Sequence, residues 1–157
     1  MKTLAISLSL LLLLAACGGG SSQSGTQSVP GKGAVAIQVI PNPIVATRAS
    51  GDMYDFPFEV VVRETGGHPI DVTRVSATVN GPGGLTFARE SWDADRIRSM
   101  GYSTAVPANG ELRYRFTPRR EVPDERLFGG VSAELTVEAV DASSAPTSAS
   151  TNVTVTR

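Results

Sequence analysis

The chain is poor in the residues on which many catalytic and metal sites depend. Its 157 residues include one cysteine and one histidine, whereas a zinc site needs three or four nitrogen or sulfur ligands. The histidine, His68, lies in a Gly-Gly-His-Pro stretch with no evident nucleophile or acid partner. Paired carboxylates could still serve as acid and base, although no pair stands out. The sequence therefore predicts a protein that is not an enzyme, with no catalytic residue and no bound cofactor.

A strong excess of charge is also missing. There are 14 basic and 15 acidic residues, and loss of residues 1–16 would remove only Lys2 from that balance. Binding to nucleic acid usually needs a large basic excess on the domain surface. We therefore expect no nucleic-acid partner.

One long apolar run occurs, and it lies at the N-terminus. Residues 4–16 are apolar apart from Ser7 and Ser9. As a helix they would span roughly 20 Å, whereas the hydrocarbon core of a membrane is roughly 30 Å thick. The run therefore fits a signal peptide better than an anchoring helix.

The run ends in Leu14-Ala15-Ala16-Cys17, which resembles the lipobox of bacterial lipoproteins. The resemblance covers residues 1–17. It implies a signal peptide at 1–16, a diacylglycerol on Cys17 as the covalent lipid, and a membrane partner held through that anchor. The alternative is an ordinary secretory signal with a chance cysteine. Because Gly18 rather than an aspartate follows Cys17, the resemblance points to the cell envelope and to the outer membrane more than the inner membrane.

The stretch that follows the cysteine has the composition of a linker. Residues 18–33 read GGGSSQSGTQSVPGKG and contain almost no apolar side chains that could form a core. We expect residues 17–33 to form a lipidated cysteine and a flexible spacer, and residues 34–157 to form one domain.

Most of that domain shows apolar residues at every second position. Such alternation gives each strand one buried face and one solvent-exposed face, as in antiparallel sheets that pack on each other. The clearest segments are 35–39, 56–62, 112–116, 133–139 and 153–155.

Two interruptions predict local irregularities. Pro41 and Pro43 cannot donate to a ladder, so the chain should change sheets near them. Between Val72 and Val75 the inward positions change from even to odd numbers, which predicts a bulge near Thr73 and Arg74.

The Asn109-Gly110 pair suggests a hairpin. A three-residue loop at 108–110 would place Val106 opposite Leu112 and keep one face apolar, with Gly110 in the left-handed conformation.

These patterns predict an all-β fold, an immunoglobulin-like or fibronectin-like antiparallel β-sandwich of seven to nine strands over residues 34–157. The resemblance is one of pattern, because the Cys-Trp-Cys core of antibody domains is missing. Trp92 lies instead in a segment that predicts one short helical turn near 92–100, capped by Ser91. We expect this segment to cross between the sheets, with Trp92, Ile97 and Met100 closing the end of the core.

Two sets of charged residues are candidate binding sites. Arg113, Arg115, Arg119 and Arg120 could grip an anionic glycan or lipopolysaccharide, or could simply keep a strand face soluble. Calcium could bind acidic loops if several converge, although solvated loop acids explain the same residues. The acids concerned are Asp52 with Asp55, Asp93 with Asp95, and Asp124 with Glu125.

The favoured function is a membrane-tethered, non-catalytic binding or adhesion-type module for an envelope protein or a glycan. The alternative is a structural or accessory subunit of an envelope complex that uses strand addition at a sheet edge. An enzyme is the least favoured class.

Overall fold

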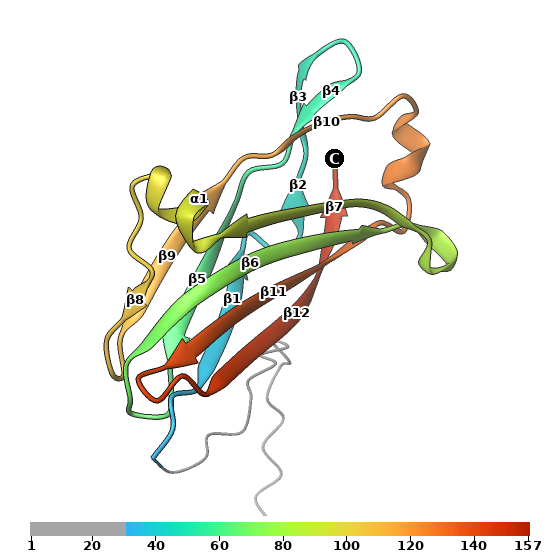
Figure 1. Cartoon of the computed structure of the whole chain (residues 1–157). Coiled ribbons are helices and arrows are strands. Elements are labelled where there is room, and N and C mark those ends of the chain that lie inside the picture. The colour runs from blue at the N-terminus through green and yellow to red at the C-terminus, as the bar shows by residue number, and fades with distance from the viewer. Residues whose placement is uncertain (1–30) are drawn as a thin grey trace, which may run out of the picture.

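The computed structural model describes residues 31–157, which form a β-sandwich with its core between two large sheets (Figure 1). The first sheet has the order β1-β5-β9, with β1 Val35–Ile40, β5 Phe58–Glu64 and β9 Glu111–Phe116. The second has the order β2-β12-β11-β6-β7, with β2 Ile44–Val45, β12 Pro146–Thr156, β11 Ser132–Asp141, β6 Ile70–Asn80 and β7 Thr86–Asp93. The short β8, Ala105–Val106, also pairs with β6. The predicted all-β sandwich is confirmed, and its two large sheets contain nine strands.

Three further strands form a small third sheet, which the sequence did not predict. Its order is β10-β4-β3, with β3 Thr47–Ser50, β4 Met53–Asp55 and β10 Arg119–Glu121. Helical segments are short: η1 Pro82–Gly84, α1 Ala94–Ser99 and η2 Glu125–Phe128. Within the described part of the chain, none of the helices has the length and apolar character required to span a membrane.

The alternating residues face the core as predicted. Val35, Ile37, Val60 and Val62 of the first sheet are all buried, as are Leu135 and its neighbours of the same phase on β11. At the centre, Trp92 stacks on Phe116 with a ring-centroid distance of 4.1 Å. Burial of these side chains provides the main stabilisation of a domain in which no disulfide can form, since the chain has a single cysteine.

Both predicted irregularities are present. After β1 the chain passes Pro41 and Pro43, leaves the first sheet, and pairs through β2 in parallel with β12 of the second sheet. On β6 the register against β11 shifts so that Glu138 pairs with Arg74 and Ala139 with Val72. Thr73 is therefore the extra residue of a bulge, and the inward phase changes across it.

The predicted hairpin register is wrong. Val106 on β8 pairs with Ile70 of β6, whereas Leu112 on β9 pairs with Val62 of β5. The two strands therefore belong to different sheets. Asn109, with φ of 55°, adopts the left-handed conformation that was expected of Gly110, and Gly110 N–H donates to the carbonyl of Pro107 at 2.8 Å.

The helical segment also differs in part from the prediction. Trp92 is the penultimate residue of β7, and Asp93 rather than Ser91 caps α1 by accepting the Arg96 N–H at 2.8 Å. Because β7 and β8 both pair with β6, α1 stays at one edge of the second sheet and does not cross between sheets. Trp92 and Ile97 are buried as expected, but Met100 is 41% exposed and does not close the core.

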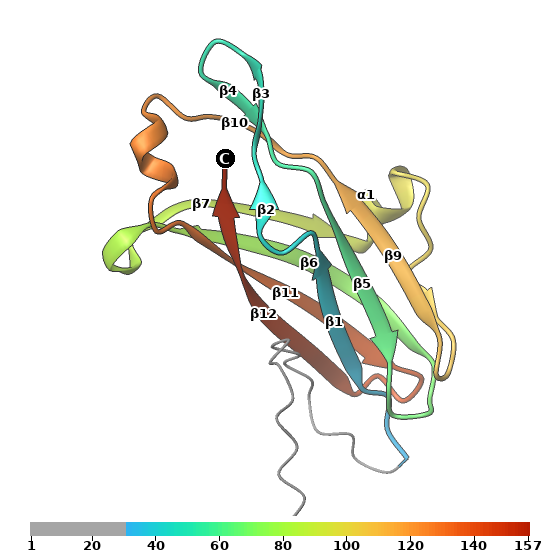
Figure 2. The ribbon, with the colours of Figure 1, turned by 180° about the vertical axis from the view of Figure 1, so that it is seen from behind.

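The described chain enters the sandwich at one end, beside the β5–β6 and β11–β12 turns (Figure 2). Two buried carboxylates fix it there: Gly33 N–H donates to Asp141, and Ala34 N–H donates to Glu64. The opposite end of the sandwich carries the third sheet and η2 (Figure 1).

Candidate binding cavity at the open end of the sandwich

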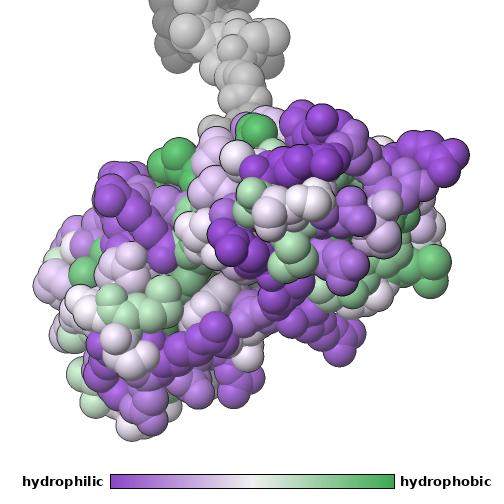
Figure 3. Space-filling view, turned by 90° about the horizontal axis from the view of Figure 1, so that it is seen from above, coloured by the Kyte–Doolittle hydropathy of each residue, from purple (hydrophilic) through white to green (hydrophobic). Residues whose placement is uncertain are grey.

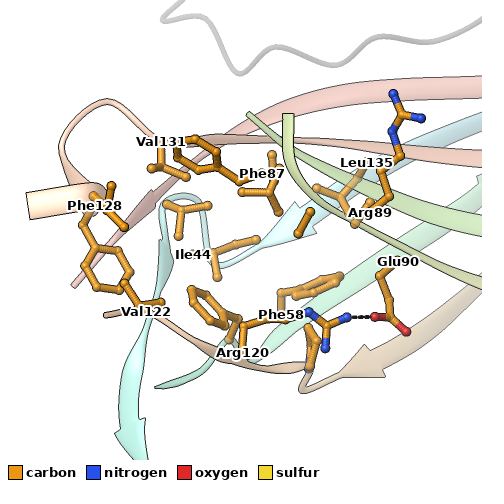
Figure 4. Close-up of a pocket in the computed structure, with 18 of the residues that line it drawn as sticks. Ile44, Phe58, Phe87, Arg89, Glu90, Arg120, Val122, Phe128, Val131 and Leu135 are labelled. Atoms are coloured by element: carbon orange, nitrogen blue, oxygen red, sulfur yellow. Dashed lines mark hydrogen bonds and ion pairs between the residues drawn. The ribbon is translucent and has the colours of Figure 1, made fainter. Parts of the chain in front are cut away.

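An apolar cavity of about 290 Å³ lies between the sheets at the end opposite to the point where the chain enters. Its walls come from the late residues of β6 and β12, the early residues of β7 and β11, and the segment from β10 to η2. Figure 4 shows Phe87 and Val131 on one side of the space and Val122 and Phe128 on another. Because neighbouring strands run antiparallel, these residues meet at one end although they are far apart in sequence.

Aromatic rings form the floor and part of the wall. Phe58 and Trp92 come from opposite sheets and contact each other edge to face, with centroids 6.3 Å apart. Phe128 of η2 is held by Tyr54, whose ring centre is 5.3 Å away in a T-shaped arrangement. Aromatic pairs prefer edge-to-face or offset geometries, so these contacts orient the rings that form the wall.

A second bulge directs Phe87 toward the cavity. The β6–β7 register shifts between Val79 and Asn80, which leaves Phe87 as the extra residue of β7. Its ring lies over Gly81, where a Cβ atom would come within 2.1 Å of it. Glycine at this position therefore lets the ring lie at the mouth, where Phe87 remains 49% exposed.

Four charged residues are part of the cavity lining: Arg89, Glu90, Arg120 and Glu121. Arg120 of β10 forms an ion pair with Glu90 of β7, across the gap between the two elements (Figure 4). The other carboxylate oxygen of Glu90 accepts from Arg96 Nη1 at 3.0 Å. Glu90 thus has two arginine partners, whereas Arg89 next to it points away from the pair in Figure 4.

A polar cluster supports the cavity wall from outside. The hydroxyl of Tyr54 donates to Glu125 Oε1 at 2.7 Å and accepts from Arg48 at 2.7 Å. Glu125 also forms ion pairs with Arg48 and Arg157. These contacts join the β3–β4 hairpin, η2 and the C-terminus.

The four candidate arginines do not form one patch. Arg113 and Arg115 lie on the outer face of the first sheet and share Glu59, with N–O distances of 2.9 Å each. These contacts, with Arg115 contributing most, hold the pKa of Glu59 below its usual value. Arg119 makes a bidentate contact with Asp55 in the third sheet, and Arg120 pairs with Glu90. Each of the four therefore already has a carboxylate partner.

The acids that were candidates for calcium are dispersed. Asp55 is paired with Arg119, Asp93 caps α1, and Asp95 pairs with Arg98 at 2.6 Å. Asp124 contacts Arg126, and Glu125 belongs to the Tyr54 cluster. Asp52 lies in the β3–β4 turn, where its carbonyl accepts from Val122 N–H. Among residues 31–157, no three acidic, histidine or cysteine side chains gather as a metal site would require.

The remaining sequence candidates lie elsewhere. His68 is exposed in the β5–β6 turn, at the end of the sandwich away from the cavity. Cys17, the predicted signal peptide and most of the predicted spacer lie outside the described residues. The sequence analysis missed Phe87, Val122, Leu127 and Phe128. A weak signal was present, because the last three are apolar residues within the charged stretch 119–128.

Comparisons with known proteins support the fold only. The chain matches no protein-family model and none of the curated protein sequences. Among solved structures, a structural-genomics target designated SoR45 matches with a TM-score of 0.58 and 14% identity, over 78% of this chain and 86% of that one. A structure described as ApaA of Bordetella pertussis gives a TM-score of 0.48 at 14% identity, covering 83% and 98% of the two chains. The C-terminal domain of wzt gives 0.46 at 13% identity, covering 88% and 80%. The last two scores are too low to carry an argument.

Proposed function

We propose that the chain is a lipid-anchored protein of the cell envelope whose sandwich is a non-catalytic binding module. The observation that carries the proposal is the position of the cavity. It opens at the end of the sandwich opposite to the point where the spacer joins, so a tether at Cys17 would present it away from the membrane.

The chemistry of the cavity favours binding. Its interior is formed by aliphatic and aromatic side chains such as Phe58, Val79 and Leu135, and its mouth carries the Arg120–Glu90 ion pair. Such a site gains free energy by removing apolar surface from water, and its few polar groups orient the ligand. A bound apolar group is therefore what this geometry supports best.

The class of ligand follows from the apolar interior of the cavity and the paired charges at its mouth. A glycan would need many hydrogen-bonding partners, and the arginines expected to supply them already hold carboxylates. A protein ligand could use the cavity by inserting an apolar side chain. Figure 3 shows the cavity end as mostly hydrophilic with small separate apolar patches, not one broad apolar surface.

A second function is favoured by the edge of the second sheet. β7 is an outer strand whose described partner is β6, and its start carries the exposed Leu85 and Phe87, at 67% and 49%. An open strand edge next to exposed apolar residues can accept an added strand. This supports the alternative of an accessory subunit in an envelope complex.

The anchor is tested by Cys17→Ala, with Ser21→Ala as a matched control in the spacer. We expect the parent and the control to incorporate a labelled acyl chain, and the Cys17 variant to incorporate none, because only a cysteine thiol can form the thioether. Incorporation at parental level by Cys17→Ala would contradict the anchor. The two functions are separated by hydrogen exchange in solubilised envelopes, since strand addition would protect the outer amides of β7.

A further inference from the structure

We infer that the cavity binds a single-chain fatty carboxylate, with the hydrocarbon tail between the sheets and the carboxylate on Arg120. This rests on the proposed binding function and names the chemical class of the ligand. Three features carry it: the apolar interior, the size of the space, and the arrangement of charges at the mouth.

The interior suits a hydrocarbon chain better than a peptide. The walls are strands whose backbone groups already pair in ladders, as in the β11–β6 pairing of Ala133 with Val79 and Leu135 with Ala77. A peptide inserted there would bury amide groups without partners, which is costly. An alkyl chain brings no polar groups and gains from contact with Phe58, Trp92 and Leu135.

The size favours one chain. Pockets for drug-sized ligands typically range from about 300 to 1,000 Å³, and this cavity is about 290 Å³. It is therefore at the lower limit of that range. A tail of moderate length fits this volume, whereas the two chains of a membrane phospholipid would exceed it.

The charges at the mouth allow Arg120 to change partner. Glu90 binds Arg120 through Oε2 and Arg96 through Oε1. If a ligand carboxylate took Arg120, Glu90 would keep its contact with Arg96. The exchange replaces one arginine–carboxylate contact by another, so its net cost is small.

The sole tryptophan provides the assay, because Trp92 lines the cavity and is 3% exposed. The full chain, mixed with phosphatidylcholine nanodiscs whether or not it is acylated, is titrated with dodecanoate brominated at its terminal carbon. We expect saturable quenching of Trp92 fluorescence. Unbrominated dodecanoate should reverse the quenching, dodecanol should compete about tenfold less well, and inorganic phosphate should not compete.

Variants test the two halves of the site. Arg120→Gln should weaken binding about tenfold, whereas Glu90→Gln, which removes the competing carboxylate, should tighten it about threefold. Arg74→Gln, on β6 but outside the cavity lining, removes a surface charge that pairs with Glu138 and should leave affinity unchanged. Val79→Phe should fill the cavity and abolish quenching. If that variant does not fold, Ala88→Leu at a half-buried position on β7 tests the same point, with circular dichroism as the check on folding.

Several results would overturn the inference. The first is a folded chain whose Trp92 fluorescence shows no saturable quenching. The second is equal competition by dodecanol and dodecanoate. The third is a change of affinity in the same direction for Arg120→Gln and Glu90→Gln. Protection of β7 amides by a second copy of the chain, without quenching, would favour strand addition instead. This inference and the proposed anchor can fail separately. An acylated chain without quenching would contradict only the fatty carboxylate ligand, and an unacylated chain with quenching would contradict only the lipid anchor.

Discussion

At the scale of single residues, Glu64 is the most consequential polar side chain in the described domain. It is 3% exposed and accepts four backbone N–H groups, from Asn109 at 2.8 Å, Ala34 at 3.1 Å, Gly66 at 2.6 Å and Gly67 at 2.9 Å. Burial acts to raise the pKa of Glu64, but the four N–H groups together outweigh it, and the pKa is lowered. One carboxylate thus joins the first strand and two loops.

Glu64→Gln should lower the free energy of unfolding at neutral pH by about 1–3 kcal/mol, because the amide places its own N–H₂ against donors that lose their acceptor. The measurement is urea denaturation followed by circular dichroism. Glu134→Gln, at an exposed position on β11, is the control and should change stability little. Equal stability of the parent and Glu64→Gln would show that water replaces the lost contacts.

Asp141 makes stability depend on acidity. The Ser143 hydroxyl, and then the N–H of Ala145, lower the pKa of Asp141 to about 2, and Ser143 and Gly33 N–H groups contribute as well. A lowered folded-state pKa stabilises the fold above the unfolded value of about 3.9, and that contribution is lost as the pH falls toward about 2. Asp141→Asn should therefore be less stable at neutral pH and show a shallower loss of stability between these values. The check is the denaturation midpoint measured across this pH range, and a slope as steep as the parent's would contradict the role.

At the scale of elements, a structural feature could be predicted when its cause lay in neighbouring residues of the sequence. The bulge at Thr73 was predictable because a change of inward phase between Val72 and Val75 is visible in the sequence itself. The sheet change after β1 was predictable from Pro41 and Pro43 for the same reason. Neither depends on which distant strand lies alongside.

The partners of β8 and β9 were not predictable in this way. Val106 and Leu112 have the same inward phase whether they face each other or lie in different sheets, so the apolar pattern allows both arrangements. The open edge of β6 beside β7 decides between the two arrangements, because residues 104–106 pair with it. One such contact is the hydrogen bond from Val72 N–H to the Thr104 carbonyl at 2.9 Å. That edge exists only after the sheet has assembled.

The residues of the cavity wall could not be predicted from the local sequence either. Phe87 reaches the mouth because of a bulge and because Gly81 leaves room, and Phe128 is held by a ring of the third sheet. Each cause lies in another element. The charged candidates, in contrast, were found by residue type, yet their ion pairs could be assigned only from the folded positions of Glu59, Asp55 and Glu90.

At the scale of the whole molecule, the sandwich has two unlike ends. One end holds the start of the described chain through Glu64 and Asp141, and the other holds the cavity, the third sheet and η2. The longest strands separate them, since β6 has 11 residues and at about 3.3 Å per residue spans about 36 Å.

Together with the proposed lipid anchor at Cys17, this polarity predicts that the two ends lie at different distances from the membrane. A dye on Ala142→Cys, in the β11–β12 turn, should be quenched by lipids with nitroxide head groups more strongly than the same dye on Leu127→Cys at the cavity end, because the tether holds the first site nearer to the membrane on average. The acylated full chain in vesicles is the sample, and an acylated Cys17 leaves the introduced thiol as the one available for labelling. A water-soluble quencher should affect both dyes alike, which controls for their exposure. Stronger quenching at Leu127→Cys would mean that the cavity faces the membrane and would reverse the proposed presentation of the binding site.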